Sequence, residues 1–118
     1  MGCASNKSNS NKAKSSNVAP NTILLRAEIC SSWGFSQRRS AVEQFAEYLK
    51  SKGETVVTHF EAVGGGGGEY FVYASYNGKE KIIFSNNKEL HKGAVIGFSI
   101  AKNKFDELIK IINQEVKN

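Results

Sequence analysis

Cys30 is the residue of this chain best placed for thiol chemistry. It opens the segment Cys30-Ser-Ser-Trp33-Gly-Phe35, which follows a short apolar run and precedes a helical pattern. A cysteine between a strand and a helix lies near the positive end of the helix dipole, which favours the nucleophilic thiolate. A second thiol three residues later would complete a redox pair, but Trp33 stands there. We therefore expect at most one-thiol chemistry from Cys30.

One-thiol chemistry would use a mixed disulfide. The Cys30 thiolate would attack glutathione disulfide or an oxidised client, and a second thiol would then release the adduct. Cys3 could supply that thiol if it carries no acyl chain, because a flexible tail reaches back occasionally. Alternatively, Cys30 is a half-buried, inert residue that ends a strand, since unbridged cysteine is among the most buried residue types.

The residues after Cys30 also have two interpretations. Arg38 or Arg39 could favour a thiolate if either guanidinium turned toward it, although solvated surface charge is the simpler role. Trp33 and Phe35 could form an apolar lip that binds a partner, or Phe35 could pack inward and leave only Trp33 exposed. Three serines could cap the following helix: Ser31, Ser32 and Ser36.

Other chemical patterns are weak. His59 and His91 lie in different expected elements, away from any cysteine or carboxylate cluster at ligand spacing, so we expect no metal site. The five glycines at 64–68 lack the lysine and hydroxyl residue of a phosphate-binding loop and are interpreted as a connector. The aromatic residues at 70–76 lack the basic residue that opens an RNA-recognition motif, so no nucleic-acid partner is expected.

The elements that position Cys30 follow from the hydropathy pattern. Residues 22–29 form an apolar run that predicts a buried strand. Apolar residues spaced by three and four from residue 36 onward predict a helix that stops at Gly53. Residues 55–60 are rich in β-branched side chains and predict a second strand, parallel to the first because a helical crossover joins them.

The second half of the chain predicts a hairpin and a closing helix. Residues 70–76 and 79–84 flank Asn77-Gly78, which is a strong hairpin signal, so these strands should be antiparallel. An apolar stripe from Phe105 to Val116 predicts an amphipathic helix. The resulting order, β-α-β-β-β-α, indicates an α/β (α+β) domain with a four-stranded mixed sheet and two helices packed on it.

This order and several motifs resemble the selenoprotein W-like (Rdx) family of thioredoxin-like proteins. The motifs are Cys30-x-x-Trp33-Gly34-Phe35, the glycine run before the aromatic strand and Asn77-Gly78, and the match covers about residues 22–116. The resemblance implies a thioredoxin-like fold with Cys30 at the first redox position. Trp33 falls where the family has selenocysteine or cysteine, so it is a genuine tryptophan or a recoded selenocysteine. The chemistry expected of Cys30 makes glutathione a possible co-substrate, and no other cofactor is expected.

Residues 1–21 form a tail of different composition. Ser, Asn, Lys and Ala dominate it, and three of the five net positive charges come from its lysines, so we expect disorder. Removal of Met1 would expose Gly2 for N-myristoylation and place Cys3 beside it for palmitoylation. Two acyl chains and the lysines would hold the protein at the cytoplasmic face of an anionic membrane. The alternative is an acetylated, disordered N-terminus.

Length and cysteine content favour one cytoplasmic domain over residues 22–118. This stretch can bury a modest core without disulfides. Two cysteines are too few for a secreted disulfide framework, and no apolar run approaches the roughly 18 residues of a spanning helix. Two functions remain open: a membrane-tethered one-thiol oxidoreductase in cell redox homeostasis, or a non-catalytic adaptor that has lost the redox pair.

Overall fold

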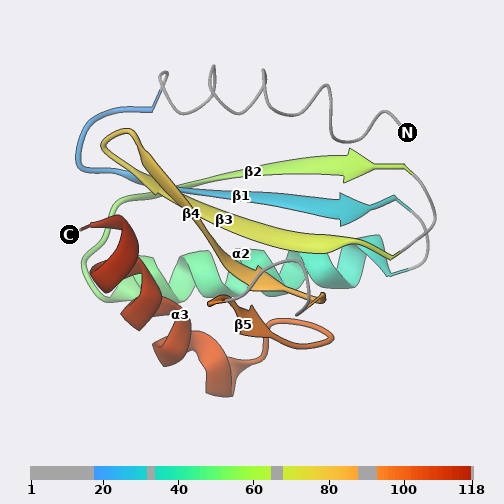
Figure 1. The fold of residues 1–118 in the computed structure, drawn as a ribbon. Coiled ribbons are helices and arrows are strands. Elements are labelled where there is room, and N and C mark those ends of the chain that lie inside the picture. Colours follow the sequence, from blue (N-terminus) through green and yellow to red (C-terminus); the bar gives the residue numbers. More distant parts are fainter. Residues whose placement is uncertain (1–17, 32–33, 65–67, 88–92, 118) are drawn as a thin grey trace.

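The computed structural model describes residues 18–31, 34–64, 68–87 and 93–117. Within these ranges, a five-stranded sheet carries two helices on one face (Figure 1). The elements in chain order are β1 (Ile23–Cys30), α2 (Phe35–Ser51), β2 (Val56–Val63), β3 (Tyr70–Tyr76), β4 (Lys79–Ser85), β5 (Val95–Ile96), the 3-10 turn η1 (Lys102–Lys104), α3 (Phe105–Ile111) and the π-helical turn η2 (Ile112–Val116).

The sheet has the strand order β2-β1-β3-β4-β5. The parallel pairing of β1 with β2 and the antiparallel pairing of β3 with β4 confirm two predictions. The predicted count of four strands is wrong, because Val95 and Ile96 pair with Phe84 and Ser85 as a fifth strand parallel to β4. Two residues are too few to show an alternating pattern, so this strand left no signal in the sequence.

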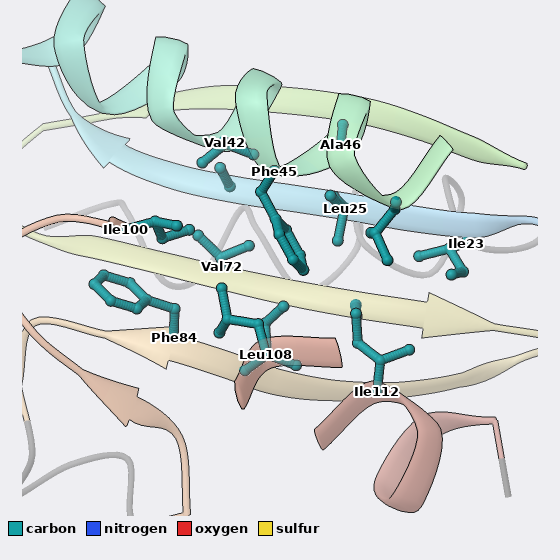
Figure 2. Close-up of a cluster of buried hydrophobic side chains, with 14 of the residues drawn as sticks. Ile23, Leu25, Val42, Phe45, Ala46, Val72, Phe84, Ile100, Leu108 and Ile112 are labelled. Atoms are coloured by element: carbon teal, nitrogen blue, oxygen red, sulfur yellow. The ribbon is translucent and has the colours of Figure 1, made fainter. Parts of the chain in front are cut away.

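The core lies between the sheet and the helices. Alternation along β1 directs Ile23, Leu25, Ala27 and Ile29 toward α2. Helix α2 contributes four buried residues at the predicted spacing: Val42, Phe45, Ala46 and Leu49. Figure 2 shows the side chains of Val42, Phe45 and Ala46 between the helix and the sheet. Burial of each large side chain is worth about 1.5–3 kcal/mol, so this contact fixes the helix on β1 and β2.

Helix α2 is flanked by two glycines, Gly34 before it and Gly53 two residues after it. Gly34 precedes it with a φ of 91° and without a side-chain capping bond. The serine cap expected from Ser31 or Ser36 is therefore not formed, and Ser32 lies outside the described residues. At the other end Gly53 has a φ of 93°, and its N–H donates to the Lys50 carbonyl at 3.0 Å, which confirms the predicted stop.

The hairpin between β3 and β4 forms as predicted. Asn77 and Gly78 have φ values of 50° and 86°, as a type I′ turn requires. Asn77 also holds the chain that enters β1. The Asn21 N–H donates to Asn77 Oδ1 at 2.7 Å, and Asn77 Nδ2 donates to Asn21 Oδ1 at 3.2 Å. Contacts with the domain therefore start in the last residues of the predicted tail.

The closing helix packs on the same face of the sheet as α2. Its buried residues continue the predicted stripe: Phe105, Leu108, Ile112 and Val116. The Phe105 ring centroid lies 5.3 Å from that of Phe45 and 5.1 Å from that of Tyr48. Within the described residues, neither this helix nor any other is long and apolar enough to cross a membrane. The predicted acylation sites, Gly2 and Cys3, lie outside the described residues.

Candidate functional site

Cys30 is the last residue of β1, the strand that precedes α2 in the chain. Its N–H donates to the Glu69 carbonyl at 2.8 Å, and the Ser31 N–H donates to the Val63 carbonyl at 3.0 Å. These bonds fix Cys30 between β2 and β3 at the carboxyl end of the parallel pair, where Figure 1 shows α2 beginning. The expected position between strand and helix is thus observed.

The Cys30 side chain is buried and faces away from α2. Its exposed fraction is 2%. Because side chains alternate along a strand, Cys30 shares a face with Leu24, Arg26 and Glu28, opposite to the residues that contact α2. The expectation that the dipole of α2 favours a thiolate requires the side chain near the start of the helix. This orientation weakens that expectation.

The face that carries Cys30 is lined with charged groups. Arg26, which is 1% exposed, contacts the Glu28 carboxylate, and its Nε lies 3.3 Å from Glu80 Oε2. Its guanidinium carbon lies 4.0 Å from the centroid of the Tyr73 ring. Burial disfavours the charged form, but the hydrogen bond that Arg26 donates to the Glu28 carboxylate and the charge of Glu80 outweigh it and raise the pKa of Arg26. Arg26 is therefore a permanent buried cation.

Sequence reasoning missed this network because β1 looked uniformly apolar. The informative signal was the alternation of Leu25 and Ala27 with Arg26 and Glu28, which distinguishes a two-faced strand from one buried on both sides.

His59 and Glu61 extend the charged face onto β2. His59 Nε2 lies 3.2 Å from Glu61 Oε2. The described ranges contain no cluster of three or more His, Cys, Asp or Glu side chains that could hold a metal ion. His91 lies outside these ranges.

Arg38 and Arg39 make their contacts on the helix side of the sheet. Arg38 Nη1 donates to the Gly68 carbonyl at 3.2 Å, and its guanidinium carbon lies 5.1 Å from the ring centroids of Tyr70 and Phe98. Arg39 Nε lies 3.4 Å from a Glu43 carboxylate oxygen. The interpretation of both arginines as packed or solvated charges accounts for these contacts without any role at the thiol.

The aromatic surroundings of the site differ from the predicted lip. Phe35 is partly buried and packs against the core, as the inward-packing alternative expected. Trp33 lies outside the described residues. Phe98 is 74% exposed and sits beside Arg38, but it follows a polar, glycine-containing connection that gave no reason to select it.

Glu69 is a second residue that sequence reasoning did not select. Its Oε1 is buried and has no hydrogen-bond partner among the described residues, although its backbone carbonyl holds Cys30. It places a carboxylate at the same end of the sheet as the thiol.

Comparison of the chain with protein-family models, with curated proteins and with solved structures finds no match. The resemblance to selenoprotein W-like proteins therefore rests on the motifs quoted above and remains a prediction.

Proposed function

We propose that this chain is a membrane-tethered, thioredoxin-like protein of the selenoprotein W type in which Cys30 performs one-thiol redox exchange. The observation that supports this most is the place of Cys30, at the carboxyl end of a parallel strand pair and five positions before the first residue of α2. The proposed tether uses Gly2 and Cys3.

The proposed reaction is removal of glutathione from a client protein. The Cys30 thiolate attacks the glutathione sulfur of a client–glutathione disulfide, so the old S–S bond breaks and the client leaves as a thiolate. A second glutathione thiolate then attacks the same sulfur of the Cys30 adduct. Cys30 is regenerated and glutathione disulfide leaves. No second thiol within the motif takes part, so Trp33 does not block the cycle.

Burial of Cys30 sets a condition on this chemistry. A thiol that is 2% exposed reacts from a locally opened conformation, and the free energy of that opening adds to the barrier. Alkylation of Cys30 in the native protein should therefore be at least about tenfold slower than in denaturant, since about 1.4 kcal/mol of opening energy suffices for that factor.

The test is deglutathionylation activity of the full chain carrying Cys30→Ser. We expect loss of turnover, because the adduct of the proposed cycle forms on Cys30. Cys3→Ser is the matched control, since it removes the other thiol of the chain and should keep activity. Unchanged turnover in Cys30→Ser would refute the proposal.

A second candidate function is favoured by the burial of Cys30 itself. In it, the domain is a non-catalytic adaptor that binds a membrane-proximal partner through Trp33 and neighbouring aromatic residues. Phe98, exposed and beside Arg38, adds an apolar anchor of the kind found in binding surfaces. This candidate predicts that partner binding tolerates Cys30→Ser and is weakened by Trp33→Ala or Phe98→Ala.

A further inference from the structure

The two edges of the sheet differ in a way that points to one of them as an interface. One edge is β5, which has two residues. The other is β2, which has eight residues and pairs with β1 without a register shift. It contains no proline, lysine or bulge, the features that usually protect an edge strand from pairing with another chain. Within the described residues, no strand lies on its outer side.

The hydrogen bonds of β1 show which groups of β2 face outward. The Ile23 N–H donates to the Thr55 carbonyl at 2.9 Å, and the Ser31 N–H donates to the Val63 carbonyl at 3.0 Å. In a parallel pair, alternate residues direct both backbone groups to the same neighbour. The odd-numbered residues of β2 therefore bond to β1. The even-numbered residues direct N–H and C=O away from the sheet: Val56, Thr58, Phe60 and Ala62.

We propose that this edge binds a second copy of the chain, with β2 antiparallel to β2 about a two-fold axis at His59. In this register Thr58 pairs with the partner's Phe60, and Val56 pairs with the partner's Ala62. Each pair exchanges both backbone hydrogen bonds. All four outward residues of each copy are then satisfied, and the two sheets become one.

The side chains of β2 suit their own antiparallel copy. On the helix side, Thr58 meets the partner's Phe60, a β-branched and aromatic combination that stabilises sheets. On the other face Val57, which is 45% exposed, lies opposite the partner's Glu61 and becomes covered. His59 lies opposite its own copy and diagonal to the partner's Glu61. In this register no two carboxylates and no two lysine or arginine side chains are directly opposed.

The helices are compatible with this arrangement. Helix α2 packs over both β1 and β2, and Figure 1 shows it beneath these strands. With strands about 4.8 Å apart, the two copies of α2 would run about 10 Å apart, a normal packing distance for helices. The flank of α2 nearest β2 carries Arg39, whose guanidinium lies 4.8 Å from the Phe60 ring centroid, and Glu43. Both side chains are about half exposed. The two-fold axis lets Arg39 of each copy pair with the partner's Glu43.

The experiment is sedimentation equilibrium of the full, unacylated chain with Thr58→Pro and Thr58→Ala. Both changes remove the threonine side chain, but only proline removes the outward N–H, which faces no other strand among the described residues. We expect a dimer for the wild type and for Thr58→Ala. Thr58→Pro should raise the dimer dissociation constant at least tenfold, because two interface hydrogen bonds are lost in each dimer. Circular dichroism checks that the proline variant stays folded.

Amide hydrogen exchange of the wild type tests the same interface without any substitution. Dilution should speed exchange at Val56, Thr58, Phe60 and Ala62 and leave Val57, His59 and Glu61 unchanged, because the latter amides bond to β1. A wild-type chain that is monomeric at about 1 mM, where even weak dimers form, would overturn the proposal and leave this edge to an extended segment of another protein. Equal dimerisation of both Thr58 variants, or exchange independent of dilution, would also overturn it.

Discussion

Cys30 and Arg26 share one face of β1, and both are almost completely buried. Arg26 carries a permanent positive charge and forms ion pairs with Glu28 and Glu80. This face of β1 is therefore stabilised by ionic contacts, whereas the opposite face is stabilised by apolar packing. Cys30 and Arg26 are thereby buried on a polar face whose other charged side chains, such as Glu80 at 28%, are partly exposed. The chemistry of Cys30 depends on how readily that face opens.

Replacement of Arg26 by Met tests the ionic contacts. The change keeps much of the side-chain volume but leaves the Glu28 carboxylate, which is 12% exposed, without its cation. We expect the free energy of unfolding to fall by about 3 kcal/mol, measured by urea denaturation. The double variant Arg26→Met/Glu28→Leu should recover most of the loss. A single variant as stable as the wild type would show that the ion pairs contribute little.

The buried tyrosines predict loss of stability in alkali. Burial raises the pKa of Tyr70 above its ordinary value of 10.0, and burial followed by the charge of Glu28 does the same for Tyr73. The unfolded chain then releases these protons first, so stability is complete below about pH 10 and falls as the pH rises toward the folded-state pKa values.

Urea denaturation between pH 8 and pH 11, with phenolate absorbance as a second signal, checks this prediction. Tyr73→Phe should flatten the decline. A free energy of unfolding that stays constant across the range would contradict it.

Some strands and helices could be predicted from their sequences more clearly than others. The hairpin and α2 were predictable because Asn77-Gly78 permits a type I′ turn and because apolar residues recur at helical spacing. The fifth strand was not, since Val95 and Ile96 gain their pairing from β4 and not from a local pattern. The position of Cys30 was predictable from the strand-to-helix transition. Its burial and direction were not, because both depend on neighbouring strands.

Gly78→Ala tests the hairpin. Its φ of 86° costs an L-residue about 1–2 kcal/mol, so urea denaturation should show a loss of that size. Gly64→Ala is the control. That glycine lacks a positive φ, and an added Cβ would meet nothing within 4 Å, so its loss should stay within about 0.5 kcal/mol. Equal losses for both variants would show that the turn conformation is not the cause.

The chain enters and leaves β1 at opposite ends of the sheet. Asn21, joined to Asn77, fixes the entry of the chain at one end of β1, and Cys30 lies at the other, roughly 25 Å away along the strand. A membrane anchor in the tail would therefore hold the domain by the end opposite the thiol.

Gly2→Ala tests the anchor. Without a glycine amine no myristoyl chain is added, and we expect the protein to move from the membrane pellet to the soluble fraction. Cys3→Ser should give partial release, since one acyl chain binds bilayers only marginally. Membrane retention of Gly2→Ala would refute lipid anchoring.

The most direct test of the one-thiol function is mass spectrometry of the peptide from Cys30 to Arg38, thiol-trapped from the organism's own cells with and without mild oxidant. The peptide reports the adduct on Cys30 and the identity of residue 33 together. A glutathione or client adduct on Cys30 that increases with oxidant is the predicted result. An unmodified Cys30 beside a genuine Trp33, under oxidant that modifies other cellular thiols, would contradict redox catalysis and leave the adaptor function.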